Sequence, residues 1–287
     1  MPEYRRDPGT GSLHYLEFGQ GEPLLLLHGN GADAQLYMPI MAALSPHFHL
    51  LAPDLPGHGF SRGVRPATTA AYLDLIETFV RTHIQGPFRV IGHSLGGLVS
   101  YHLMRRGLPI SSAVWMEPAI FELRPLLKAL LPLYAKGYAN SLHYRPEVLR
   151  HLRSLSYNPA QADPVRVAAF VEAYMRSCRK VQALWLREYP QFLPWQFEDL
   201  QLPILCIRGV KNTFISRATT ALVPRLPQAQ EVILAEAGHC LLNENNRALL
   251  QEILGHFGKE VPERHAHRVS QSEPVLAGSA LSVLEAL

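Results

Sequence analysis

The residues best suited to chemistry in this chain form a serine turn flanked by glycine. Residues 92–96 read GHSLG, after an apolar run at 88–91 and before a helix-forming stretch at 98–106. A strand, a tight turn and a helix are the context that a G-x-S-x-G nucleophile elbow requires. The two glycines leave room for a strained serine backbone, and the helix N-terminus favours negative charge where an oxyanion would form. The pattern therefore predicts that Ser94 is a nucleophile rather than part of an ordinary turn.

Three other segments follow the order and spacing of a known family. Residues 24–31 read LLLLHGNG, residues 54–61 read DLPGHGFS, and residues 237–239 read AGH after an apolar run. Together with the serine turn, they make the chain similar to the α/β-hydrolase superfamily over about residues 12–258. The resemblance implies a serine hydrolase in which His28, His58 and His93, together with Asp54 and Ser61 of the DLPGHGFS segment, brace loops around the turn.

A serine hydroxyl is a weak nucleophile at its free pKa and needs a base within hydrogen-bond reach. By resemblance that base is His239, which follows a predicted strand and precedes the last predicted helix. An oxyanion hole is expected from backbone N–H groups, one of them on Leu95 directly after the nucleophile. The resemblance assigns the second donor to the N–H of Asn30, in the loop after the strand at 24–27.

The family pattern breaks at the acid that orients the histidine. Its usual place is the loop after the predicted strand 204–208, where this chain has Asn212. An amide does not neutralise an imidazolium, and the corresponding Asp-to-Asn change in a serine protease costs about 10⁴ in turnover. Glu117 is the favoured acid, because it ends a predicted strand and some relatives take their acid from this strand end. Glu236, three residues before His239, is a weaker alternative. A further alternative is that no carboxylate serves and the enzyme is impaired.

The residue types argue against several other chemistries. Similar dehalogenases and epoxide hydrolases use Asp as the nucleophile, whereas position 94 is Ser. No His, Asp and Glu cluster has the spacing of metal ligands, so no metal is implied. Residues 92–97 have neither the spacing nor the lysine of a phosphate-binding loop. The sequence implies no cofactor.

Composition agrees with one large α/β domain. The chain has 287 residues, of which 47% are hydrophobic and 18% charged. A net charge of +3 without a basic, aromatic-interleaved stripe argues against nucleic acid. Three widely spaced cysteines indicate neither a disulfide framework nor a zinc site, which favours a cytoplasmic location. No apolar stretch reaches the roughly 18 residues of a membrane span, and no signal-peptide pattern follows the early arginines.

Strands and helices alternate along most of the chain, which predicts an α/β fold with a mostly parallel, doubly wound sheet. The predicted strands are 13–18, 23–27, 49–53, 88–91, 112–116, 204–208 and 231–234. The predicted helices outside the middle of the chain are 35–44, 69–84, 95–106, 217–226 and 245–257.

Between residues 118 and 202 this alternation stops and helical patterns separated by prolines take over. They cover 123–138, 146–155 and 165–189. We therefore assign 1–117 and 203–258 to the hydrolase core, 118–202 to a helical cap, and 259–287 to a tail expected to be mobile.

A cap over the open edge of a sheet builds an apolar pocket. Large apolar residues are expected on the underside of the cap, where some face this pocket and others only pack the cap against itself: Leu126, Leu127, Leu130, Leu131, Tyr134, Phe170, Tyr174, Trp185, Phe192 and Trp195. This favours a small-molecule substrate with a hydrophobic acyl or alcohol part. The leading prediction is a serine hydrolase that cleaves a carboxylic ester through an acyl-enzyme. One alternative is hydrolysis of a carbon–carbon bond in a diketone-like substrate, and another is a non-catalytic ligand-binding member of the fold.

Overall fold

An eight-stranded sheet forms the centre of the computed structural model, which describes residues 2–10, 12–141, 143–160, 162–211 and 213–260. Asn212 and nearly all of the predicted tail 259–287 lie outside the described residues. The strands are β1 (Glu3–Arg6), β2 (His14–Phe18), β3 (Glu22–Leu27), β4 (Phe48–Pro53), β5 (Phe88–His93), β6 (Ile110–Met116), β7 (Ile204–Gly209) and β8 (Ala229–Leu234).

The sheet has the order β1-β2-β4-β3-β5-β6-β7-β8. From β4 to β8 every neighbouring pair is parallel, whereas β1 and β2 add an antiparallel edge. The mostly parallel α/β prediction is confirmed. The edge strand β1 was not predicted, because its polar sequence EYRR carries no apolar alternation and only its pairing with β2 makes it a strand.

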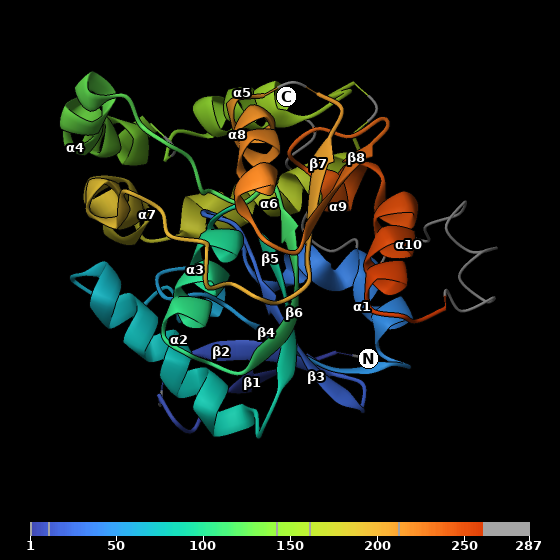
Figure 1. The fold of residues 1–287 in the computed structure, drawn as a ribbon. Helices are drawn as coiled ribbons and strands as arrows, with labels where there is room; N and C mark the ends of the chain where they lie inside the picture. Colours follow the sequence, from blue (N-terminus) through green and yellow to red (C-terminus); the bar gives the residue numbers. More distant parts are fainter. Residues whose placement is uncertain (1, 11, 142, 161, 212, 261–287) are drawn as a thin grey trace.

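Helices cover both faces of the sheet (Figure 1). They are α1 (Met38–Leu44), α2 (Thr69–His83), α3 (Leu95–Arg105), α8 (Phe214–Leu222), α9 (Leu241–Glu244) and α10 (Asn246–His256). The four leucines that end β3 alternate between two cores: Leu25 and Leu27 pack with α2 and α3, while Leu24 and Leu26 pack with α1 and α10. A strand buried on both faces reads as a continuous apolar run for this reason.

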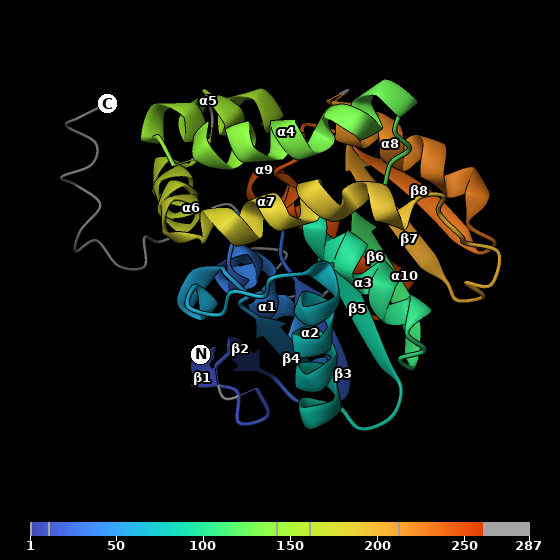
Figure 2. The ribbon, with the colours of Figure 1, turned by 90° about the vertical axis from the view of Figure 1, so that its left-hand side faces the viewer.

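Four helices between β6 and β7 lie over the carboxyl ends of the parallel strands (Figure 2). They are α4 (Pro125–Ser141), α5 (Arg145–Leu155), α6 (Pro164–Arg176) and α7 (Arg179–Glu188). The single helix predicted over 165–189 is wrong: Ser177 and Cys178 are extended between α6 and α7. The backbone N–H of Cys178 donates to the carbonyl of Gly57 at 2.7 Å. Contact with the core therefore breaks a helix that the sequence pattern alone would continue.

Two glycines let the cap helices approach the core closely. A Cβ on Gly57 would lie 2.6 Å from Val181 of α7, and a Cβ on Gly31 would lie 2.4 Å from the ring of Tyr174 of α6. Both glycines also have positive φ, at +83° and +81°, which side-chain-bearing residues rarely adopt. The cap is thus seated directly on the two loops that follow β3 and β4.

Candidate active site

Ser94 lies at the turn between β5 and α3, with φ 52° and ψ −111°. A Cβ on Gly92 would lie 2.6 Å from backbone atoms of Gly96, and a Cβ on Gly96 would lie 1.8 Å from the carbonyl oxygen of Leu27. No side chain fits at either position without moving the backbone. The serine N–H donates to the carbonyl of Met116 at 2.9 Å, so the end of β6 holds the strained turn in place.

Two backbone N–H groups beside the serine are available to a ligand. The N–H groups of Leu95 and Asn30 have no hydrogen-bond partner within the described part of the chain, and both residues line the same cavity as Ser94. The Asn30 side chain is occupied elsewhere, since its Oδ1 lies 3.1 Å from His58 Nε2 and its Nδ2 donates to the carbonyl of Gln182 at 3.4 Å. Leu95 is the first residue of α3, so its N–H belongs to the positive end of that helix.

His239 and Glu117 form a short hydrogen bond, 2.7 Å from Nδ1 to Oε2. They are 122 residues apart in sequence and meet because β6 and β7 end side by side, next to the loop after β8. The second oxygen of Glu117, Oε1, accepts the N–H of Gly209 at 3.1 Å. Glu117 is fully buried, so both carboxylate oxygens are satisfied by protein groups.

The backbone at this carboxylate is also strained. Within the described residues, positive φ occurs at three non-glycine positions: Ser94, Glu117 at 43°, and Glu236 at 54°. Such conformations cluster at functional sites, where the surrounding fold holds them. Glu236, the alternative acid, is exposed to solvent, and among the described residues its carboxylate forms no hydrogen bond or ion pair with His239, whose Nδ1 is paired with Glu117.

The backbone of His239 is clamped from two sides. Its N–H donates to the carbonyl of Leu155, at the end of cap helix α5, at 2.9 Å. Its carbonyl accepts the Nε2–H of His93 at 2.9 Å. Burial, with a further contribution from His239, lowers the pKa of His93 to about 3, so this imidazole is a neutral donor at pH 7. Both core and cap therefore set the position of the His239 ring.

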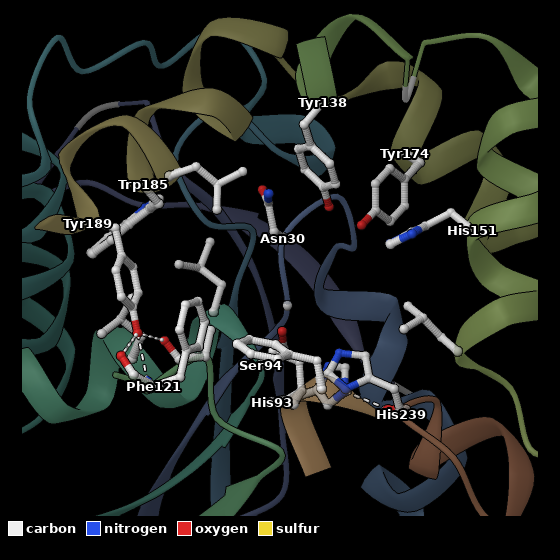
Figure 3. Close-up of a pocket in the computed structure, with 18 of the residues that line it drawn as sticks. Asn30, His93, Ser94, Phe121, Tyr138, His151, Tyr174, Trp185, Tyr189 and His239 are labelled. Carbon is white, nitrogen blue, oxygen red and sulfur yellow. Dashed lines mark hydrogen bonds between the residues drawn. The ribbon is translucent and has the colours of Figure 1, made fainter. Parts of the chain in front are cut away.

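Ser94 and His239 face the same cavity, with the serine hydroxyl directed into it (Figure 3). No direct hydrogen bond joins the hydroxyl to the imidazole in the described structure. Such contacts are often long in unliganded enzymes and tighten when substrate binds. Hydroxyl, imidazole and carboxylate follow one another in the order that nucleophilic catalysis by serine uses.

The cavity has a volume of about 790 Å³ and a largely apolar lining. Of the ten residues expected on the underside of the cap, seven line the cavity, namely Leu127, Leu130, Leu131, Tyr134, Phe170, Tyr174 and Trp185. The other three do not line it. Leu126 is 70% exposed, Phe192 packs on the ring of His102, and the Trp195 indole donates to the carbonyl of Phe121. Sequence reasoning also missed Tyr138 and His151, which enter the cavity from α4 and α5.

The remaining motif residues brace loops. Asp54 accepts the N–H groups of Ala34 and Phe60, each at 2.8 Å, and burial raises its pKa to about 7. Ser61 Oγ accepts the N–H of His14 at 2.9 Å. His28 Nε2 accepts the N–H of Leu55 at 2.9 Å. The contacts of Asp54 with Ala34 and of His28 with Leu55 tie the segment after β4 to the loop that carries Asn30, and the Ser61 contact ties it to β2.

Comparison with known proteins defines the class. A model of the alpha/beta hydrolase family matches residues 24–252. The chain belongs to this family and is a hydrolase. The pimeloyl-[acyl-carrier protein] methyl ester esterase of Vibrio vulnificus is 24% identical over 262 residues, covering 86% of this chain and 98% of that protein.

Two further likenesses are narrower. The (E)-2-((N-methylformamido)methylene)succinate hydrolase of Acinetobacter baylyi is 38% identical over 90 residues, which are 31% of this chain and about a third (34%) of that relative. A thermophilic esterase from Thermogutta terrifontis, solved with malate bound, superimposes with a TM-score of 0.74 at 21% identity, over 90% of this chain and 98% of that structure. The structural likeness shows the shared fold.

Two other findings concern ligands and membranes. Among the described residues, no group of three or more His, Cys, Asp or Glu side chains has an arrangement that would hold a metal ion. No helix in that part of the chain is long and apolar enough to cross a membrane.

Proposed function

We propose that this hydrolase cleaves a carboxylic ester with a hydrophobic part through an acyl-enzyme on Ser94. The observation that carries the proposal is the 2.7 Å contact between Glu117 and His239, whose imidazole lines the same cavity as Ser94. The Glu117 carboxylate accepts the Nδ1–H of His239, so the neutral imidazole carries its proton on Nδ1. The other ring nitrogen, Nε2, can then accept the serine proton. In this proposal Glu117 fills the role that the usual loop position, Asn212, does not.

Acylation begins when Ser94 Oγ attacks the ester carbonyl carbon while His239 Nε2 takes the hydroxyl proton. The carbonyl oxygen becomes an oxyanion, which accepts hydrogen bonds from the N–H groups of Leu95 and Asn30. Collapse of this intermediate breaks the bond to the alcohol oxygen. His239 then donates its proton to that oxygen, and the alcohol leaves.

Deacylation repeats these steps with water. His239 accepts a proton from a water molecule that attacks the acyl carbon, and the same two N–H groups stabilise the second oxyanion. Collapse of this intermediate breaks the bond between the acyl carbon and Ser94 Oγ, His239 donates its proton to Oγ, and the carboxylic acid leaves. The imidazolium forms twice per cycle, and both times the carboxylate of Glu117 stabilises its charge.

The cavity supports a hydrophobic small-molecule substrate, because its lining includes numerous leucine and aromatic side chains. The Vibrio vulnificus relative, which is named a methyl ester esterase, supports ester hydrolysis as the reaction.

The test is covalent labelling of the purified protein with a fluorophosphonate probe, alongside hydrolysis of p-nitrophenyl octanoate. The wild type is expected to be labelled at Ser94 and to release p-nitrophenol. Ser94→Ala is expected to remain folded by circular dichroism but to lose the label and nearly all turnover. A wild type that takes up no label and hydrolyses no ester would refute the proposal and favour a ligand-binding protein.

A further inference from the structure

Three cap side chains form a polar cluster at one end of the otherwise apolar cavity. Tyr138 comes from α4, His151 from α5 and Tyr174 from α6, and all three line the cavity. Figure 3 shows them on the side of Ser94 where His239 lies. We call these three residues the polar end. Phe121, Trp185 and Tyr189 lie on the opposite side and are called the aromatic end.

The polar end has hydrogen-bonding capacity left over. Tyr138 and Tyr174 interact with each other through their side chains, and neither hydroxyl hydrogen-bonds to any other described residue, which leaves hydroxyl protons and lone pairs available. The imidazole of His151 makes no hydrogen bond within the described residues and has edge contacts with the two tyrosine rings, at 6.0 and 6.2 Å between centroids. Donors and acceptors at this end are therefore open to a bound molecule.

The aromatic end differs although it also contains a tyrosine. The Tyr189 hydroxyl accepts the N–H of Phe121 at 2.7 Å and faces the carbonyl oxygens of Ala119 and Phe121 at 3.1 Å each. Its polar atom is occupied by the backbone, so the side chain presents only its ring to the cavity. An apolar chain therefore meets the ring of Tyr189 without taking a hydrogen bond away from its hydroxyl.

No charged side chain lines the cavity among the described residues, since its lining contains no Asp, Glu, Lys or Arg. The titratable groups of the polar end stay neutral at pH 7. Burial raises the pKa of Tyr138 to about 12, and burial followed by the charge of His239 lowers the pKa of His151 to about 4. A carboxylate or phosphate would be desolvated here without a counter-ion, which is costly. An alcohol hydroxyl both donates and accepts, as these groups do.

The reaction decides which part of an ester meets which end. His239 donates a proton to the departing alcohol oxygen, so the alcohol part must lie on the His239 side of the serine. The polar end lies on this side, and the acyl chain then extends toward the aromatic end. At the polar end, the ring of Tyr174 packs directly on Gly31, the residue after Asn30, where a Cβ would lie 2.4 Å from the ring. This close packing fixes the position of the ring.

We propose that the substrate is an uncharged ester that joins an apolar carboxylic acid to a hydroxyl-bearing alcohol, as in a glycerol monoester. The free hydroxyls of the alcohol bind Tyr138, His151 and Tyr174. This inference rests on the proposed ester hydrolysis at Ser94 and specifies its substrate class.

The first test compares three esters of one acid: 1-monooctanoylglycerol, ethyl octanoate and 1-octanoylglycerol 3-phosphate, each below its micellar concentration. The expected kcat/KM for the glycerol ester exceeds that for the ethyl ester by about 10-fold, because at least one additional hydrogen bond forms. The phosphorylated ester is expected to be the poorest of the three. Equal kcat/KM for the glycerol and ethyl esters, or preference for the phosphorylated one, overturns the inference.

The second test removes the polar atoms while keeping the rings, with His151→Phe, Tyr138→Phe and Tyr174→Phe. The matched control is Tyr144→Phe, an exposed cap tyrosine outside the cavity lining. For each cavity variant, the loss of kcat/KM on the glycerol ester is expected to exceed the loss on ethyl octanoate by about 3- to 10-fold. The control is expected to keep the wild-type ratio. Equal losses on both esters would indicate a structural role and refute the assignment.

The outcomes distinguish failure of the inferred substrate class from failure of the proposed ester hydrolysis at Ser94. If the protein hydrolyses 1-monooctanoylglycerol and ethyl octanoate with equal kcat/KM, the proposed ester hydrolysis stands and only the inferred substrate class is refuted. A protein that hydrolyses neither ester and takes up no fluorophosphonate loses both.

Discussion

Replacing Glu117 by Gln tests the least usual part of the proposed site. The carboxylate uses both oxygens: one accepts the Nδ1–H of His239 at 2.7 Å and the other accepts the N–H of Gly209 at 3.1 Å. Glutamine has only one acceptor oxygen, and its NH₂ group must face one of these two donors. The side chain is fully buried, so water does not relieve the mismatch.

Either orientation of the amide impairs the site. If the NH₂ group faces His239, the imidazole must place its proton on Nε2, where it cannot accept a proton from Ser94. If the NH₂ group faces Gly209, two donors oppose each other and the imidazolium has no anion beside it. The tautomer loss and the missing charge correspond to about 10⁴ in kcat by analogy with a serine protease. This equals about 5.5 kcal/mol of transition-state stabilisation.

The assay is steady-state hydrolysis of p-nitrophenyl octanoate, with thermal denaturation to confirm folding. We expect kcat to fall by 10³- to 10⁴-fold and KM to change little, since Glu117 lies behind His239 and outside the cavity lining. Glu236→Gln is the matched control, because it makes the same chemical change at the exposed alternative acid. Asn212→Ala is expected to cost far less than Glu117→Gln. A folded Glu117→Gln enzyme with kcat within 10-fold of wild type would refute the proposed role.

Two further outcomes are expected. Among p-nitrophenyl esters, kcat/KM should rise from acetate to octanoate by up to about fourfold per methylene, because each buried methylene contributes about 0.8 kcal/mol; a flat series would show that the acyl chain stays out of the apolar cavity. The second outcome concerns pH. Burial holds the pKa of His28 well below 6.5 and lowers those of His58 and His93 to about 4 and 3, so the native state binds fewer protons than the unfolded chain below pH 6.5. Stability present above pH 6.5 should therefore be lost as pH falls toward 4, by up to about 1.4 kcal/mol per histidine and pH unit. The raised pKa of Asp54 opposes this with a single proton. Calorimetric Tm values at pH 7.5, 6 and 5 check the direction, and a constant Tm would contradict it.

Local patterns in the sequence were enough to predict the serine turn and the parallel sheet. Gly92 is demanded by contacts within one strand–turn–helix unit, where a Cβ would lie 2.6 Å from backbone atoms of Gly96. Apolar runs such as 24–27 predict buried strands because both faces of a parallel sheet are covered. These requirements act over a few residues and so leave a readable trace.

The choice among the candidate acids depended on the tertiary structure. Glu117 and Glu236 are both carboxylates at the ends of strands, and the sequence favoured the first without placing either beside His239. The pairing of β6 with β7 brings Glu117 to within 2.7 Å of the imidazole across 122 residues. Glu236, only three residues from the histidine, is exposed.

In the cap, too, local sequence patterns predicted some features and the tertiary structure decided the others. Helical periodicity predicted its helices but not the break at Ser177 and Cys178, which the contact with Gly57 makes. Nor did it show that Tyr138 and His151 enter the cavity, because a helix pattern gives one apolar face and does not say what that face meets. Propensity and patterning act along the chain, whereas the composition of the cavity is set by how four cap helices dock on the core.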